Sequence, residues 1–332
     1  MWNMLLSRKI FRPFSLAFRK YQVTVVGGAS DIGQTLCLLL RAQPCITKLV
    51  VHDTRVHTSG VLLDLSHIPS DSKIKGYTDE EALDASLQNS DLVLAVGGEI
   101  QNPGTNKKSW LTKNTEFIKT LAKSLSKLSP SPFCGIVTEP INRLVPMAAE
   151  IIRHYGEYDP KKLFGVTTID ALRARALFAS DHNLHPHDCI VPVIGGHSDK
   201  TTVPLLSQSK PSKEQNDQII LDFTTRLRKC DEIVTEAKKG WAPTLSVAFS
   251  VLVFTRSILD ALGGKPGKVN ALIENNDFGT YFLSGTVNVN QKGAGEMERY
   301  CDLTQYECYL LEGSLEQLRK DVMNGKKVLE MT

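Results

Sequence analysis

Short runs of β-branched and other apolar residues alternate with helix-like segments through the first half of the chain. The pattern predicts strands at YQVTVVG, KLVVHD, SDLVLAVGG, PFCGIVTEP and KKLFGV. Helices are predicted between them, at DIGQTLCLLLRAQ, at VLLDLSHI and over roughly residues 114–128. Strands that alternate with helices across short loops indicate βαβ units, and hence a parallel sheet covered on both faces.

The second half has a different pattern, in which strands and long helices are less regularly interleaved. It predicts, in chain order, a helix over 168–182, short strands at DCIVPVIGG and KTTVPL, helical stretches near 213–239 and 244–262, strands near 268–289, and a helix from about 309. We therefore expect an α/β protein: a Rossmann-type doubly wound parallel sheet over residues 21–166, followed by an α+β catalytic domain over residues 167–332.

The charge of the chain is unevenly distributed. There are 39 Lys and Arg residues against 36 Asp and Glu, but five of the basic residues lie in the first twenty positions, and no acid precedes Asp31. Without that segment 34 basic residues face 36 acidic ones, and such a body gives no reason to expect a nucleic-acid partner. No uninterrupted apolar run is long enough for a membrane span, so no membrane partner is expected either.

The basic, acid-free start contains interspersed Ser and large apolar residues, which is the composition of a mitochondrial transit peptide. We predict that residues 1–20 are such a peptide, cleaved before Tyr21, and that the mature protein lies in the matrix. A disordered basic tail is the alternative. The seven cysteines form no CxxC pair and no Cys/His cluster, so we expect reduced thiols and no metal site.

A glycine-containing turn, GGASDIG, follows the first strand and opens the first helix. Gly27 and Gly33 fit the roles that a dinucleotide site gives to the tight turn and to helix packing, whereas Ser30 brings a side chain to the place where the pyrophosphate meets backbone. Asp53 ends the second strand, where a carboxylate accepts hydrogen bonds from the adenine ribose and repels a 2′-phosphate. The turn predicts NAD as cofactor in preference to NADP, and an ordinary turn in a non-binding sheet is the alternative.

Three residues of the second half carry candidate chemistry. Asp170 and Arg173 lie three apart on a predicted helix and so share a face, and His197 follows two glycines. Alone, they are typical of a surface ion pair and a structural turn histidine. Together, behind a dinucleotide-like half, they predict a 2-hydroxy-acid dehydrogenase in which His197 exchanges the hydroxyl proton and Asp170 holds it, while Arg173 binds the substrate carboxylate.

From Tyr21 onward the chain resembles NAD-dependent malate dehydrogenases of the mitochondrial and bacterial type. The resemblance rests on IGQTLCLLL, SGVLLDLSH, IKGY, LFGVTTIDALRARA, VPVIGGHSDKT and TLSVAF. It implies a homodimer or a tetramer of dimers, a small 2-hydroxy or 2-oxo acid as substrate, and a place in the tricarboxylic acid cycle. It also implies that Ile32, Gly97, Gly98 and Asn114 approach the cofactor, although the glycines and the asparagine are also typical of plain loops.

Several positions depart from the family pattern. Where the family carries two substrate arginines, this chain has Gln101 and Lys107, with Lys108 beside it, and Glu139 replaces the asparagine that reaches substrate and nicotinamide ribose. Trp241 and Pro243 replace small residues. Gln101 cannot balance a second carboxylate, Lys107 lacks the planar fork of arginine, and Glu139 adds a negative charge that Lys107 could neutralise. Drift on a surface loop would explain Gln101 alone.

Two functions remain open at this point. One is an NAD-dependent dehydrogenase for malate or, because lactate dehydrogenases carry glutamine at the Gln101 position, for a monocarboxylate. The other is a catalytically impaired mitochondrial paralogue that has a structural or binding role.

The leader prediction can be tested directly. Residues 1–24 fused to a fluorescent reporter should carry the reporter into mitochondria, because a basic, acid-free segment is what the import machinery selects. A matched fusion in which Arg8, Lys9, Arg12, Arg19 and Lys20 are replaced by glutamine should stay in the cytosol. A cytosolic signal from the unaltered fusion would show that the segment is not a transit peptide.

Overall fold

A computed structural model describes residues 20–102 and 104–327, so the predicted leader lies outside the described residues except for Lys20. A single sheet runs through the described part of the chain. Its strands are β1 (Tyr21–Val26), β2 (Ile46–His52), β3 (Lys73–Tyr77), β4 (Leu92–Ala95), β5 (Phe133–Ile136), β6 (Leu163–Val166), β7 (Val193–Gly195), β8 (Thr202–Pro204), β9 (Gly267–Glu274), β10 (Phe282–Asn290) and β11 (Gly293–Met297).

The first half of the sheet is parallel, in the order β3-β2-β1-β4-β5-β6. The strand order therefore reverses between β1 and β4, and ligands of open α/β sheets bind at such a point, outside the carboxyl ends of the strands. This arrangement confirms the predicted fold class. β3 is a strand that the pattern did not predict, because its sequence, KIKGY, mixes lysines with a glycine on an edge strand.

The sheet continues without a break into the second half. β6 pairs antiparallel with β9, where Gly165 lies opposite Leu272, and antiparallel pairing continues through β10 to β7 and β8, with β11 on the side of β10. The apolar core extends along this sheet, from Val23 in β1 to Leu272 in β9, both of which are fully buried.

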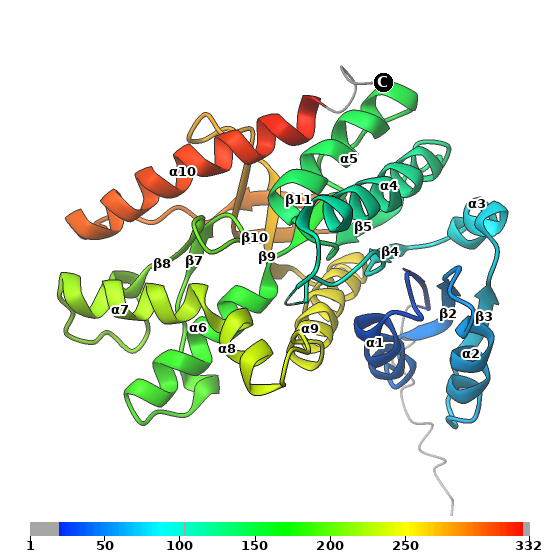
Figure 1. The fold of residues 1–332 in the computed structure, drawn as a ribbon, viewed down its shortest axis with the longest axis horizontal. Helices are drawn as coiled ribbons and strands as arrows, with labels where there is room; N and C mark the ends of the chain where they lie inside the picture. Colours follow the sequence, from blue (N-terminus) through cyan, green and yellow to red (C-terminus); the bar gives the residue numbers. More distant parts are fainter. Residues whose placement is uncertain (1–19, 103, 328–332) are drawn as a thin grey trace, which may run out of the picture.

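The described residues form ten α-helices. Figure 1 shows how the helices are arranged around the sheet. They are α1 (Asp31–Arg41), α2 (Thr58–Ser66), α3 (Leu83–Leu87), α4 (Lys107–Leu125), α5 (Ile141–Tyr155), α6 (Thr168–Asp181), α7 (Asp217–Arg228), α8 (Cys230–Ala237), α9 (Leu245–Leu262) and α10 (Gln305–Lys326). α5 packs against α10, and α1 packs against α9, which joins the two halves.

The helices differ from the prediction mainly at their ends. α4 begins at Lys107 rather than near residue 114, because Asn106 accepts hydrogen bonds from the backbone N–H groups of Lys108 and Ser109 and so caps the helix there. α10 begins at Gln305, after a capping box in which Thr304 and Glu307 bond each other's backbone. α5 was not predicted, and it contains Pro146.

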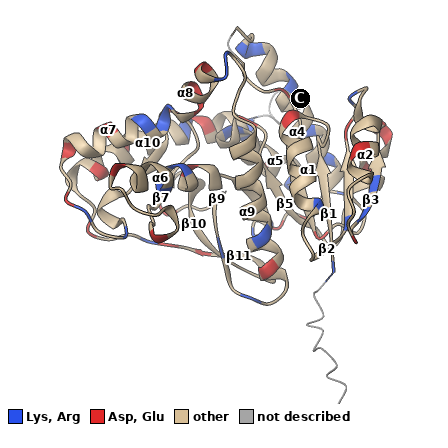
Figure 2. Cartoon of the chain, turned by 90° about the horizontal axis from the view of Figure 1, so that it is seen from below, with Lys and Arg blue, Asp and Glu red and all other residues tan. Residues whose placement is uncertain are grey.

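α9 is unusually apolar. Among the described residues it is the one helix that is long and apolar enough to span a membrane, but half of it is buried inside the protein. It packs against α1, α6, β9 and β10, so it serves as a core helix. Figure 2 shows basic and acidic residues interspersed over the outer helices of the described part.

Candidate functional site

A cavity of about 760 Å³ opens at the carboxyl ends of the parallel strands. Its size is within the range of small-molecule and cofactor sites. Its walls come from both halves of the chain: the β1–α1 turn and the loops after β2, β4 and β5 on one side, and residues of α6, α7, α8, α9 and the β7–β8 turn on the other.

The β1–α1 turn has the backbone that the sequence predicted. Gly27 has a φ of +89°, and a Cβ at this position would collide with the Cα of Gly97 at the end of β4. A side chain on Gly33 would likewise collide with the carbonyl oxygen of Gly27. The two glycines therefore allow α1 to begin directly above the sheet, with its N-terminus at the cavity, where a pyrophosphate would meet backbone N–H groups.

Ser30 lines the cavity, but its side chain does not extend toward the phosphate position that the sequence suggested. Its side chain is buried, and its Oγ donates to the carbonyl oxygen of Val96 at 2.9 Å and accepts from the backbone N–H of Gly33 at 3.0 Å. Ser30 is thus the N-cap of α1, turned inward toward β4. The correction follows from capping geometry, and it removes the steric objection to a dinucleotide. Asp31 and Ile32 line the cavity beside it.

Asp53 lies at the end of β2, as predicted, but its carboxylate is not free. Its Oδ2 accepts from the backbone N–H of Ala29 at 2.9 Å and pairs with Nη1 of Arg55 at 2.6 Å. Nη2 of Arg55 donates to the carbonyl oxygen of Gly98 at 2.7 Å. Arg55 was not singled out from the sequence, because its contact with the end of β4 depends on sheet order.

Asn114 braces the backbone around the cavity. Fully buried in α4, it accepts from the N–H of Glu99 at 2.7 Å and donates to the carbonyl oxygen of Glu139 at 2.8 Å. Gly98, with a φ of +84°, lies against its side chain, and a Cβ there would collide with the amide. The role of Asn114 in this structure is to hold the ends of β4 and β5 in register.

His197 and Asp170 are brought together as predicted. The carboxylate Oδ2 of Asp170, in the first turn of α6, lies 2.6 Å from Nδ1 of His197, and only 13% of the histidine side chain is exposed. The backbone N–H of His197 donates to Oδ1 of Asn142 at 2.8 Å, which anchors the β7–β8 turn on α5. This leaves Nε2 as the ring nitrogen that faces the cavity.

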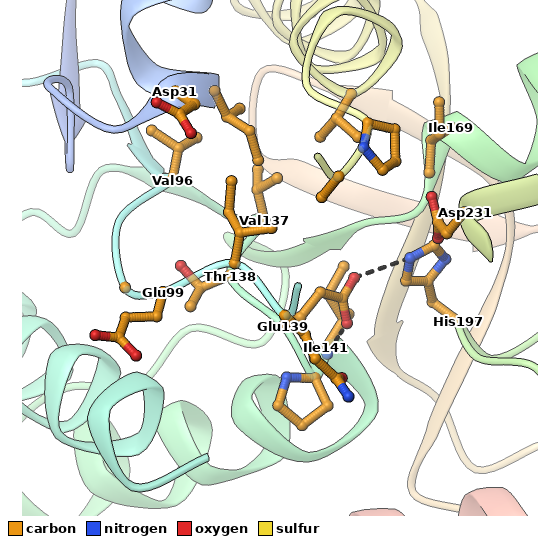
Figure 3. A pocket seen from close by; sticks show the side chains of 18 of the residues that line it. Asp31, Val96, Glu99, Val137, Thr138, Glu139, Ile141, Ile169, His197 and Asp231 are labelled. Atoms are coloured by element: carbon orange, nitrogen blue, oxygen red, sulfur yellow. Dashed lines mark hydrogen bonds and ion pairs between the residues drawn. The ribbon is translucent and has the colours of Figure 1, made fainter. Parts of the chain in front are cut away.

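Glu139 approaches that second nitrogen. Its Oε1 lies 2.8 Å from Nε2 of His197, while its Oε2 accepts from the backbone N–H of Ile141 at 3.0 Å. Figure 3 shows the carboxylate pointing at the imidazole ring across the cavity. From the sequence, Lys107 was the residue that could neutralise Glu139. That suggestion is wrong, because Lys107 is the exposed first residue of α4 and the Glu139 carboxylate pairs with His197.

The two carboxylates control the charge of the imidazole. Burial alone would lower the pKa of His197, but the charges of Asp170 and Glu139, with their hydrogen bonds, outweigh it and raise the pKa well above the ordinary value. The two carboxylates therefore favour the imidazolium form of His197 in this arrangement.

Arg173 is also paired with a carboxylate of the protein. Its Nη2 donates a hydrogen bond to Oδ1 of Asp231 in α8. Burial opposes both charges, but the pairing prevails: it raises the pKa of Arg173 and lowers that of Asp231. Asp231 was missed by sequence reasoning, which had no signal that α8 would place it opposite α6.

The altered loop positions differ in their placement. Gln101 lines the cavity, as does Pro243, whereas the Trp241 side chain is 65% exposed. Acids outnumber arginines in the described lining: Asp31, Glu99, Glu139, Asp170, Asp199 and Asp231 face Arg55, Arg173 and Arg228.

Comparison with protein families gives two consecutive matches. Residues 21–165 match the family model for the lactate/malate dehydrogenase NAD binding domain, and residues 167–329 match the lactate/malate dehydrogenase alpha/beta C-terminal domain.

Solved structures share the fold at low sequence identity. Malate dehydrogenase of Cryptosporidium parvum has a TM-score of 0.77 at 22% identity, covering 93% of this chain and 100% of its own. Malate dehydrogenase of Picrophilus torridus has a TM-score of 0.79 at 21% identity, covering 94% and 99%. Lactate dehydrogenase of Cryptosporidium parvum, complexed with lactic acid and β-nicotinamide adenine dinucleotide, has a TM-score of 0.78 at 20% identity, covering 95% and 99%.

The Glu139 contact predicts a measurable pKa effect. Glu139→Gln should lower the pKa of His197, because one of the two carboxylates that stabilise the imidazolium is removed. The ring signals of His197, assigned with a His197→Asn variant, would report the titration by NMR. The variant should also be less stable than wild type at acidic pH, and this difference should vanish as the pH rises through the wild-type pKa, above which the imidazole is neutral in both.

Glu99→Gln is the matched control, since Glu99 lines the same cavity but pairs with Lys113. An unchanged His197 titration in Glu139→Gln would show that the contact does not persist in solution.

Proposed function

Because the chain belongs to the lactate/malate dehydrogenase family, we propose that it interconverts small 2-hydroxy and 2-oxo acids with NAD, and that it acts on a monocarboxylate in preference to malate. One observation carries this proposal. The imidazole of His197 is oriented by Asp170 at 2.6 Å, and its other nitrogen faces a cavity that also contains Arg173 and the β1–α1 turn.

The proton chemistry follows from this orientation. Asp170 fixes the proton on Nδ1 of His197, so Nε2 is the nitrogen that takes the hydroxyl proton in oxidation and returns it in reduction. NAD, the cofactor of the family's binding domain, supplies hydride transfer when bound. The turn at Gly27 and the N-terminus of α1 would hold its pyrophosphate.

The substrate must displace two of the protein's own carboxylates. Asp231 is bonded to Arg173, where a substrate carboxylate would bind, and Glu139 lies 2.8 Å from Nε2, where the substrate oxygen would bind. A monoanion can replace Asp231 at Arg173 by exchanging one charge for another. A dianion would add a second negative charge beside Gln101, which offers only a neutral hydrogen bond.

The predicted assembly and location are part of this proposal. We infer a homo-oligomer, a dimer or a tetramer of dimers, from the family resemblance. The basic, acid-free first twenty residues support a mitochondrial matrix location.

A substitution at His197 tests the function. His197→Asn should abolish turnover in both directions while leaving NADH affinity within about twofold, because the imidazole contacts substrate rather than adenosine. In wild type, 2-oxo acid reduction should fade as the pH rises through the raised pKa of His197, since reduction needs the imidazolium, and hydroxy-acid oxidation should fade as the pH falls. Steady-state rates and fluorescence titration with NADH supply both measurements. If the wild-type protein binds NADH but turns over no 2-oxo acid, the proposed dehydrogenase activity is refuted.

A triple variant tests the substrate preference. Gln101→Arg with Lys107→Arg and Glu139→Asn should raise kcat/KM for oxaloacetate by about 10² or more, because Gln101→Arg adds a guanidinium to the cavity lining and Glu139→Asn removes a misplaced negative charge. Lys123→Arg, in the same helix as Lys107, is the control for an added guanidinium. If the triple variant binds NADH and remains inactive with oxaloacetate, the cause lies elsewhere, and Asp231→Asn is the next substitution to add.

A further inference from the structure

The cofactor groove contains an ion pair whose basic member is the exposed one. Only 4% of the Asp53 side chain is exposed, whereas 33% of the Arg55 side chain is. The Asp53 carboxylate accepts two backbone hydrogen bonds. The N–H of Ala29 donates to Oδ2 at 2.9 Å, and the N–H of Arg55 donates to Oδ1 at 3.1 Å. A ligand that enters the groove therefore meets the guanidinium before it meets the carboxylate.

Arg55 reaches across the carboxyl end of β1. It follows β2, and its Nη2 bonds the carbonyl oxygen of Gly98, just beyond β4, at 2.7 Å; β1 lies between these two strands. The guanidinium thus lies above the Gly27 turn and lines the cavity. Its five N–H groups include two that make the bonds to Asp53 and Gly98, so further donors remain for a ligand.

This geometry changes the electrostatic argument for cofactor choice. A carboxylate after β2 selects against a 2′-phosphate when its charge is uncompensated, and an arginine nearby accommodates that phosphate. Here the charge of Asp53 is balanced at 2.6 Å by Arg55. Asp31 adds a negative charge in the first turn of α1, where the pyrophosphate shared by NAD and NADP would bind, so its charge would not distinguish the two cofactors.

We propose that Arg55 binds the 2′-phosphate of NADP and that the groove accepts NADP as well as NAD. This replaces the preference expected from Asp53 alone, and it rests on the proposed function only in taking the groove as a dinucleotide site. A planar guanidinium bonds a phosphate through two parallel N–H groups, whereas the ribose hydroxyl of NAD gains nothing from the added charge.

The test is a fluorescence titration of the full chain with NADH and NADPH. Wild type should bind the two with Kd values within about tenfold of each other. Arg55→Ala should weaken NADPH by about tenfold or more, the loss expected for a hydrogen bond to a charged group, while NADH stays within about twofold or binds more tightly because Asp53 is released to the ribose.

Two further variants sharpen the result. Arg55→Gln, which can still donate to Gly98 but has no charge, should show the same selective loss and covers the case in which Arg55→Ala misfolds. Arg299→Ala, which removes an 81% exposed arginine paired with Asp277 elsewhere on the surface, should change neither affinity.

Three outcomes would overturn the proposal. NADH binding without NADPH binding would show that Asp53 still excludes the phosphate. Equal weakening of both cofactors in Arg55→Ala would place Arg55 at the shared pyrophosphate. Failure of wild type to bind either cofactor would overturn the proposed function at the same time, so the two failures can be told apart.

Discussion

The arrangement around His197 depends on one imidazolium shared by two carboxylates. Asp170 holds Nδ1 at 2.6 Å and Glu139 holds Nε2 at 2.8 Å, and the three side chains come from α6, the β7–β8 turn and the loop after β5. His197 and Asp170 are mostly buried, and either charge alone would be costly there, whereas 40% of the Glu139 side chain is exposed. Together they fasten the cofactor half to the substrate half at the centre of the cavity. The pair of Arg173 with Asp231 follows the same rule nearby, because an unpaired guanidinium there would be equally costly.

Because the cationic groups of the site are already paired with carboxylates of the protein, the binding free energy of an acidic ligand is reduced. In a site with uncompensated cations, an entering acid gains the full attraction of each. Here it gains only the difference between its own contacts and those of Glu139 and Asp231. Binding is therefore an exchange of carboxylates, and its strength depends on how well a ligand's geometry matches Arg173 and His197 compared with the side chains it replaces.

Much of the fold could be predicted from the chain, because the strands of the parallel half are short apolar runs with turns between them. His197 and Asp170 could be predicted as partners because their types and spacing fit one chemistry. The remaining contacts depend on tertiary placement. Ser30 turns inward because its hydroxyl caps α1. Glu139 pairs with His197 rather than with Lys107 because the fold brings the loop after β5 beside the β7–β8 turn, whereas Lys107 is exposed at the start of α4. Asp231 and Arg55 have no local signal, since their partners lie on elements that only the folded sheet brings near.

The pairing of β6 with β9 has a consequence for dissecting the molecule. Gly165 and Val166 lie opposite Leu272 and Ala271, so the outer edge of the parallel half is closed by strands from the far end of the chain. A fragment ending at residue 166 would expose that edge together with the apolar side chains of β6, which is the hallmark of an aggregation-prone sheet. The nucleotide-binding half is therefore not expected to be stable as an isolated domain. A gene fusion or truncation that separates it from β9 should yield insoluble protein rather than a smaller binding domain.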